Sequence, residues 1–213
     1  MPLRELFHMG GWAMWPLLLF SVSTIAIILE RIVYFLLHNL SVKDVRESVL
    51  AKIKEGDVDE AIQYCTSCSK RKLSSRIFLA GIKVFSLGEH RMERSMETEA
   101  SEHVNGLEGG FNLLLAIGSI APITGFLGTV SGMIGAFSSI ANAENVNAQL
   151  VAGGIFEALI TTAFGLAIAI VAISAYNIFI HIVDKFSAQV EEAGSEIVTN
   201  MLILKTAKNS NNS

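Results

Sequence analysis

Four of the polar side chains within the mostly apolar stretches of the sequence could take part in chemistry. Thr129 lies in one stretch, and Glu157, Thr161 and Thr162 lie at the start of the next. Polar groups are costly inside a bilayer and tend to mark ion paths there, so these residues are the candidates for function. Hydroxyls and water can relay a proton, and a carboxylate can titrate. The alternative is structural: a threonine can donate to its own helix, and Glu157 can lie at the hydrated headgroup level.

Helix geometry separates the carboxylate from one of the hydroxyls. At about 100° per residue, Glu157 and Thr161 share a helical face, whereas Glu157 and Thr162 lie about 140° apart. Glu157 and Thr162 therefore cannot both point straight into one pore, and Thr162 is the better candidate. No other carboxylate occurs between Glu144 and Asp184. Alone, the chain would make a poor proton conductor.

The composition indicates an integral membrane protein. Of 213 residues, 51% are hydrophobic and only 17% are charged, with a mean hydropathy of +0.49. The net charge of −4 gives no basic footprint for nucleic acid. Cys65 and Cys68 form one CxxC pair, which cannot supply a four-ligand zinc site, and we expect neither metal nor cofactor. No catalytic triad, phosphate-binding loop or useful carboxylate pair can be assembled, so we expect no enzyme.

Three segments pass the length test of roughly 20 apolar residues for a membrane span, which predicts an all-α membrane protein. Residues 109–143 and 158–183 contain no charged side chain, so the second and third helices are long enough to extend into the cytoplasm. The charged, helix-prone residues 89–108 are expected to run straight into the second span. The expected organisation is a short periplasmic N-terminus (1–11), a first transmembrane helix (12–37), a cytoplasmic helical segment (38–110), a second transmembrane helix (111–138), a short periplasmic loop (139–150), a third transmembrane helix (151–183) and a cytoplasmic C-terminal tail (184–213).

The distribution of lysine and arginine sets the orientation. Of the 16 cations, eleven lie in 38–110, three follow the third span, and none lies in 139–150. The positive-inside rule therefore places the N-terminus outside and the C-terminus inside. Within the inner segment, Gly56 is expected to end one helix and Asp57 to cap the next.

Small residues recur at spacings of three and four along the second and third spans. Such a face lets two helix backbones approach closely in lipid. We expect it to pack these spans against each other and against further copies of the chain; packing within one chain alone is the alternative. Pro122 crowds the carbonyl of Gly118 and predicts a mild bend. The packing residues are Gly118, Ala121, Gly125, Gly128, Gly132 and Gly135 in the second span, and Gly154, Ala158 and Gly165 in the third.

Three motifs resemble those of the ExbB/TolQ/MotA proton-channel family: "LERIVYF" after the first span, "APITGFLGTVSGMIGAF" in the second and "EALITTAFGLAIAI" in the third. The resemblance covers almost the whole chain, and the three-span layout is similar to the ExbB/TolQ branch. It implies a homopentamer around a central channel that holds two single-span helices of the ExbD/TolR type. Their membrane aspartate would titrate. An envelope-spanning TonB/TolA-type protein is a possible further partner.

The resemblance also implies roles for the polar residues. Thr129 and Thr162 match pore-facing positions, Glu157 matches an acid near the channel, and Thr161 shares its helical face. The implied function is that of an ion-channel subunit of the bacterial inner membrane, which uses the proton motive force to work on the cell envelope, in outer-membrane import or envelope maintenance. A MotA-like flagellar stator is the alternative within the family. A non-conducting membrane scaffold and half of a secondary transporter are the alternatives outside it, although the sequence shows no inverted repeat.

Overall fold

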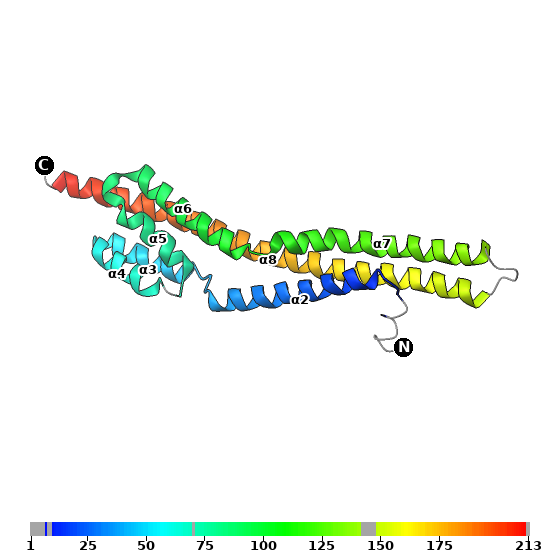
Figure 1. Cartoon of the computed structure of the whole chain (residues 1–213). Helices are drawn as coiled ribbons and strands as arrows, with labels where there is room; N and C mark the ends of the chain where they lie inside the picture. The colour runs from blue at the N-terminus through cyan, green and yellow to red at the C-terminus, as the bar shows by residue number, and fades with distance from the viewer. Residues whose placement is uncertain (1–6, 8–9, 70, 142–147, 212–213) are drawn as a thin grey trace. The chain divides into compact units, whose positions relative to one another are not determined.

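The computed structural model describes residue 7 and residues 10–69, 71–141 and 148–211. No strand occurs among these residues, and three helices are long and apolar enough to cross a membrane (Figure 1). These are α2 (Met14–Leu37), α7 (Phe111–Ala141) and α8 (Ala148–Asn211). The predicted all-α fold with three long apolar helices is confirmed. The remaining elements are α3 (Lys43–Lys54), α4 (Val58–Cys68), α5 (Leu73–Lys83), the short 3-10 helix η1 (Phe85–Leu87) and α6 (Glu89–Leu107).

The chain forms two compact units. Residues 1–30 and 110–179 make up the first, called here the membrane unit, and residues 31–109 and 180–213 make up the second, called the polar unit. Helices α2 and α8 each contribute their first part to the membrane unit and their last part to the polar unit.

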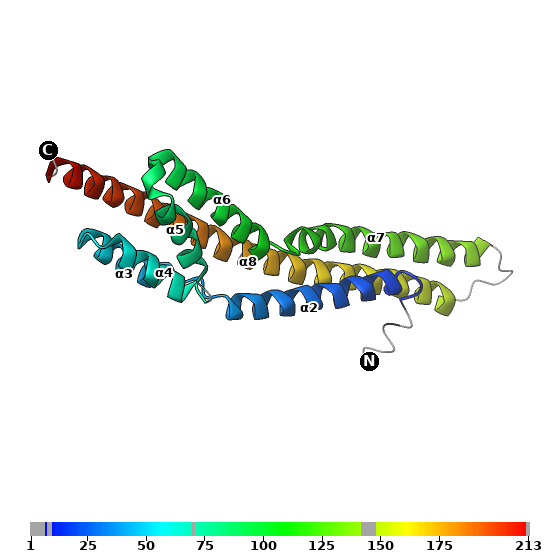
Figure 2. The ribbon, with the colours of Figure 1, turned by 60° about the vertical axis from the view of Figure 1, so that its left-hand side comes forward.

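The core of the membrane unit lies between α2, α7 and the first part of α8, which run side by side (Figures 1 and 2). Each of the three helices contributes buried side chains to this core. The core cluster consists of Met14 and Leu17 from α2, Ile117 and Ala121 from α7, and Ile160, Ile168 and Ala172 from α8. Many other apolar side chains of these helices stay exposed, as expected for surfaces that face lipid or neighbouring subunits.

Helices α7 and α8 approach to backbone contact. A Cβ atom added to Gly165 would lie 2.6 Å from the carbonyl oxygen of Ala121, and one added to Gly132 would lie 2.9 Å from that of Gly154. Both distances are shorter than real Cβ contacts, so only glycine fits. The small residues therefore pack α7 against α8 within one chain. The others that meet the partner helix or are buried are Gly118, Ala121, Gly125, Gly128, Gly154 and Ala158.

Gly135 differs from the other small residues that recur at this spacing on α7. It is exposed, and a Cβ atom added to it would meet nothing within 4 Å. It makes no close contact with α8 within one chain. Packing against further copies stays a prediction. Pro122 lies inside α7, which continues through it as one helix, and the bend also stays a prediction.

The expected continuous helix from residue 89 into the second span is wrong. Helix α6 ends at Leu107, and Gly110, with a φ of 78°, separates it from α7. The buried guanidinium of Arg31 donates to the carbonyl oxygens of Gly106 at 2.9 Å and Leu107 at 3.3 Å. It thereby satisfies carbonyls that a continuing helix would use for its own hydrogen bonds.

Helix α8 does not end at residue 183, so the expected boundary between the third span and the cytoplasmic tail at residue 184 falls within one helix and stays a prediction. Helix α8 has 64 residues and continues to Asn211, and residues 212–213 lie outside the described part. At about 1.5 Å per residue such a helix is roughly 96 Å long, well beyond a 30 Å hydrocarbon core. The continuation keeps helical spacing of buried residues, with Phe186, Val190, Ala193, Ile197 and Met201 in the core of the polar unit.

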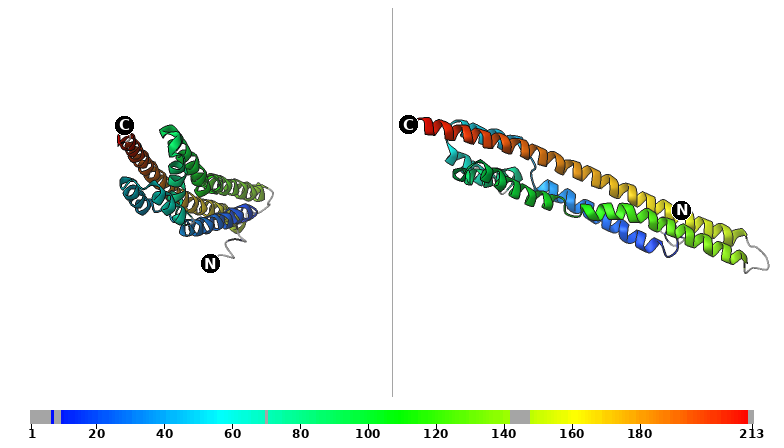
Figure 3. Two further views of the ribbon diagram at one scale, coloured as in Figure 1. Left: turned by 90° about the vertical axis from the view of Figure 1, so that its left-hand side faces the viewer. Right: turned by 90° about the horizontal axis from the view of Figure 1, so that it is seen from above.

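The polar unit consists of α3 to α6 packed with the last part of α8 (Figure 3). Gly56, with a φ of 87°, follows the end of α3, and the Asp57 side chain accepts from the amide of Glu60 at 2.9 Å. The predicted helix end and cap are thus confirmed. Arg46 of α3 pairs with Glu196 of α8 at 2.6 Å, and this hydrogen-bonded pairing raises the pKa of Arg46.

Cys65 and Cys68 are free thiols of the polar unit. Cys65 is fully buried, and burial raises its pKa to about 11. Because the thiolate is the reactive form, this cysteine is chemically inert near neutral pH. Cys65 therefore serves as a packing residue of α4.

Gly165→Ala should destabilise the membrane unit. The added methyl group would press on the Ala121 carbonyl, a backbone atom that cannot move aside cheaply. We expect a loss of about 1–3 kcal/mol in the free energy of unfolding. The measurement is loss of helical circular dichroism of the purified protein during titration with sodium dodecyl sulfate.

Gly135→Ala is the matched control, because the same methyl group would enter open space on α7. It should leave stability unchanged or raise it by up to about 1 kcal/mol, since alanine favours helix. Equal effects of the two substitutions would contradict the backbone contact described above.

Candidate functional site in the membrane unit

Thr161 and Thr162 of α8 both donate to the same carbonyl of α7. Their Oγ1 atoms lie 3.3 Å and 3.2 Å from the oxygen of Gly125. Gly125 is free of a side chain, so α8 comes close enough for these bonds between helices. The hydroxyls therefore fix the register of α8 along α7.

The burial of these two threonines differs. Thr161 has an exposed fraction of 0%, and its single hydroxyl proton is shared between the carbonyl of Gly125 and that of Ala158 in its own helix, at 2.8 Å. The Thr161 side chain thus lies in the contact between α7 and α8. Its expected pore-lining role stays a prediction. Thr162 keeps part of its surface exposed.

Thr129 is also partly exposed, and its hydroxyl donates to the carbonyl of Phe126 in its own helix at 2.6 Å. The side of α7 that meets the N-terminal end of α2 is marked by Ser131, whose Oγ accepts from Nε1 of Trp12 at 3.1 Å. At about 100° per residue, Thr129 lies roughly 160° from Ser131 around α7. Thr129 therefore faces away from α2.

Glu157 lies on the side of α8 that meets the segment leading into α2. Its carboxylate packs on the backbone of Gly11, where an added Cβ atom would collide with Oε1 and lie 2.9 Å from Cδ. Thr162 is about 140° from Glu157 around α8 and so faces away from this segment. The expected separation of Glu157 from Thr162 thus follows from the packing. Whether Glu157, Thr129 or Thr162 lines a pore stays a prediction.

Gly11 and Trp12 belong to this site, but the sequence argument did not single them out. Gly11 adopts a φ of 63°, which favours glycine, and its missing side chain makes room for Glu157. Helix α2 begins at Met14, two residues after the expected start, because this turn precedes it. The pair Gly10–Gly11 just before an apolar helix was the available signal.

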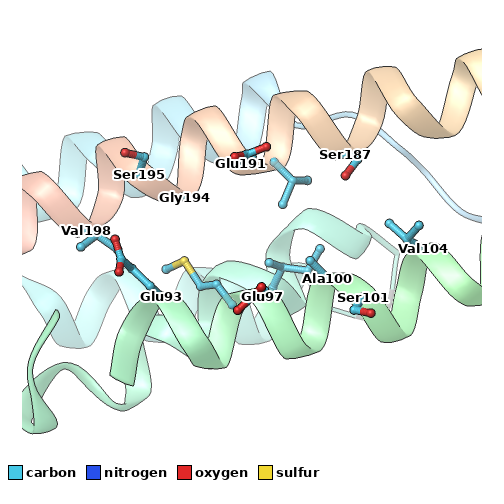
Figure 4. Close-up of a pocket in the computed structure, with 13 residues that line it drawn as sticks. Glu93, Glu97, Ala100, Ser101, Val104, Ser187, Glu191, Gly194, Ser195 and Val198 are labelled. Carbon is cyan, nitrogen blue, oxygen red and sulfur yellow. The ribbon is translucent and has the colours of Figure 1, made fainter. Parts of the chain in front are cut away.

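A hollow of about 580 Å³ lies between α6 and α8 in the polar unit (Figure 4). Glu93 and Glu97 of α6 and Glu191 of α8 line it, together with apolar side chains such as Met96 and Val198. Its carboxylates favour cationic groups. Among the described residues, however, no group of three or more His, Cys, Asp or Glu side chains is placed to hold a metal ion.

Three apolar helices of spanning length, two of which carry partly exposed hydroxyls, define the protein as a membrane protein. Residues 69–192 match the model of the MotA/TolQ/ExbB proton channel family, which is more than half of the chain. The chain therefore belongs to this family.

Relatives with curated names agree with the family. The chain is 29% identical to "Biopolymer transport protein ExbB" of Salmonella typhimurium over 199 residues, which is 85% of this chain and 77% of that protein. It is 36% identical to "Biopolymer transport protein ExbB" of Pseudomonas putida over 110 residues, covering 52% of this chain and 33% of that protein. It is also 36% identical to "Tol-Pal system protein TolQ" of Haemophilus influenzae over 115 residues, covering 49% of this chain and 50% of that protein.

Gly11→Ala should destabilise the membrane unit for two reasons. The backbone strain at a φ of 63° costs about 1–2 kcal/mol for a residue with a Cβ atom, and the methyl group also displaces the Glu157 carboxylate. The two causes can be separated by measuring unfolding free energies of Gly11→Ala in the natural background and in a Glu157→Ala background.

In the Glu157→Ala background only the backbone strain remains, so Gly11→Ala should cost less there. Gly153→Ala serves as a control for adding a methyl group to α8, because nothing lies within 4 Å of the position. An identical cost of Gly11→Ala in both backgrounds would show that Glu157 does not pack on Gly11.

Proposed function

We propose that this protein is the ion-channel-forming subunit of a motor in the bacterial inner membrane. It would use the proton motive force to drive a single-span partner that works on the cell envelope, in outer-membrane import or envelope maintenance. The observation that carries the proposal is the position of two hydroxyls. Thr129 and Thr162 are partly exposed and lie on the side of α7 and α8 that α2 does not cover. Membership of a proton channel family supports it.

A channel wall from one chain would be incomplete. The uncovered side of α7 and α8 is a surface, not a tube, so several copies have to surround a pore. We propose a homopentamer in which Thr129 and Thr162 of each copy face the centre. Exposed apolar side chains of the same helices, such as Phe126 and Leu166, are free to face neighbouring copies or the pore contents.

The titrating group must come from another protein. Glu157 is the one carboxylate in the apolar part of α8, and it lies on the side that meets Gly11 rather than beside Thr162. A hydroxyl can relay a proton but does not hold a charge at neutral pH. We therefore propose an ExbD/TolR-type partner with a membrane aspartate, and a TonB/TolA-type protein as a further component. One charge that crosses 100 mV releases about 2.3 kcal/mol to drive this partner.

The proposed orientation places the N-terminus in the periplasm and the C-terminus in the cytoplasm. It rests on the eleven lysines and arginines between residues 38 and 110 and on their absence between residues 139 and 150. The part of the polar unit that follows α2, residues 38–109, would then lie in the cytoplasm together with the end of α8.

Thr129→Val and Thr162→Val should each abolish proton-coupled activity and leave assembly intact. Valine has nearly the same shape as threonine but cannot relay a proton. Loss of Thr162 also removes one hydrogen bond to Gly125, but Thr161 still donates to that carbonyl. The measurement is proton flux into liposomes that contain the complex with its partner, followed with a pH-sensitive dye.

Thr124→Val is the matched control. Thr124 is partly exposed and donates to Ile120 of its own helix at 3.0 Å, as Thr129 does to Phe126. It lies about 20° from Ser131 around α7, on the α2 side, so its replacement should preserve flux. Full activity of both the Thr129 and the Thr162 variants would disprove the pore assignment.

The composition of the purified complex tests the need for a partner. Native mass spectrometry of the protein co-expressed with its genomic neighbour should show five copies of this chain with two copies of a single-span protein that carries a membrane aspartate. A lone dimer or tetramer would rule out the motor, and a complex without any such acid would favour the scaffold. A flagellar stator would instead restore motility to a strain that lacks its own stator subunit.

A further inference from the structure

The end of α2 shows where the polar unit meets the membrane surface. Leu36 and Leu37, in the last turn of α2, have exposed fractions of 80% and 74%. In a membrane protein, such exposed leucines belong in the hydrocarbon. The next residue, His38, stacks on Tyr34 with ring centroids 4.2 Å apart, and polar aromatic rings of this kind favour the headgroup region. We therefore expect residues 38–41 at the level of the lipid headgroups.

The loop between α4 and α5 is held at the same level. The amide of Asn39 donates to the carbonyl of Arg71 at 3.2 Å, and the Ser74 hydroxyl donates to the carbonyl of Ser41 at 3.0 Å. The Lys72 ammonium pairs with Asp44 at 3.3 Å. Three contacts thus fix the start of α5 against the segment that leaves the membrane.

This arrangement gathers cations at the membrane surface. We call Lys43, Arg71, Lys72 and Arg76 the juxtamembrane basic cluster. Arg71 and Arg76 are exposed and form no ion pair within the described part of the chain, and Arg76 uses only Nε to donate to Ser69 at 2.7 Å. Asp44, a carboxylate beside the cluster, is already paired with Lys72. The guanidinium groups of Arg71 and Arg76 therefore remain available for an external anion.

We propose that the juxtamembrane basic cluster binds the phosphate of an anionic phospholipid headgroup. Exposed guanidinium groups are suited to phosphate because they can donate two parallel hydrogen bonds. The N-terminus of the eleven-residue helix α5 adds partial positive charge beside them, and Lys72 at its cap position makes no side-chain hydrogen bond to its first amides. Clusters of cations directly beside a transmembrane helix attract anionic lipid in this way.

The position of the cluster favours a lipid over a soluble anion. The exposed leucines at the end of α2 fix the depth of the bilayer, and the backbone bond from Asn39 to Arg71 brings the loop to that depth. A lipid whose acyl chains pack on Leu36 and Leu37 presents its phosphate at the level of Arg71. The bound headgroup would hold the start of α3 and α5 at the membrane surface, independently of any ion flow.

The test compares two double variants with the same change in charge. Arg71→Gln with Arg76→Gln removes two cations from the cluster. Lys54→Gln with Lys83→Gln removes two exposed cations from the last residues of α3 and α5, about 15 Å further along helices that begin at the membrane surface. Binding of short-chain phosphatidylglycerol and phosphatidylcholine to the full-length protein in detergent is measured by native mass spectrometry.

We expect the natural protein to bind phosphatidylglycerol more tightly than phosphatidylcholine of the same chain length. The Arg71/Arg76 variant should lose about fivefold in phosphatidylglycerol affinity per cation removed, with no change for phosphatidylcholine. The Lys54/Lys83 variant should bind both lipids as the natural protein does. Arg71→Lys with Arg76→Lys should retain most of the preference, which shows that the loop still folds.

Three results would overturn the proposal. Equal binding of the two lipids by the natural protein would exclude a headgroup site, and equal losses in the two glutamine variants would indicate only an effect of net charge. Displacement of phosphatidylglycerol by inorganic phosphate at equal concentration would show that the acyl chains contribute nothing and that the site takes a soluble anion.

Discussion

The membrane unit depends on the contact between the backbones of α7 and α8. In lipid the hydrophobic effect does not bring two apolar helices together, so van der Waals packing and hydrogen bonds between the helices must hold them in contact. Gly125, Gly132 and Gly165 remove the side chains that would keep the helices apart. The hydroxyls of Thr161 and Thr162 then reach a carbonyl of the opposite helix. A glycine-rich helix with an internal proline would be weak in water but is stable here, because lipid offers its backbone no competing partner.

This contact determines where the polar residues point. Once Thr161 faces α7, helix periodicity turns Glu157 toward the segment before α2 and Thr162 away from it. On α7, the bond from Trp12 to Ser131 marks the covered side and leaves Thr129 on the other. The acid and the two partly exposed hydroxyls thus lie on different sides of one helix pair. Glu157 is therefore not placed to interact with the hydroxyls of Thr129 and Thr162 in the same chain.

The sequence predicted the parts of this structure that depend on local pattern. The three apolar helices, the glycine spacing on α7 and the cap at Asp57 follow from periodicity and composition, and the structure contains them. The features that were missed depend on residues far apart in the chain. The left-handed turn at Gly11 is explained by Glu157, which lies 146 positions away. Gly135 has the same spacing as the other small residues of α7, but it lies outside the contact between α7 and α8. Spacing alone does not make this distinction.

Arg31 shows how one such distant contact organises the polar unit. Its side chain is 8% exposed, so its charge needs partners, and it has the carbonyls of Gly106 and Leu107 and the ring of Tyr34, whose centroid is 4.7 Å away. A cation at the C-terminal end of α6 is favoured by the helix dipole. A Cβ atom added to Gly109 would lie 2.8 Å from Nη1 of Arg31, so a side chain there would displace this guanidinium. Arg31 therefore joins the last two turns of α2 to the end of α6, where it satisfies two of the terminal carbonyls.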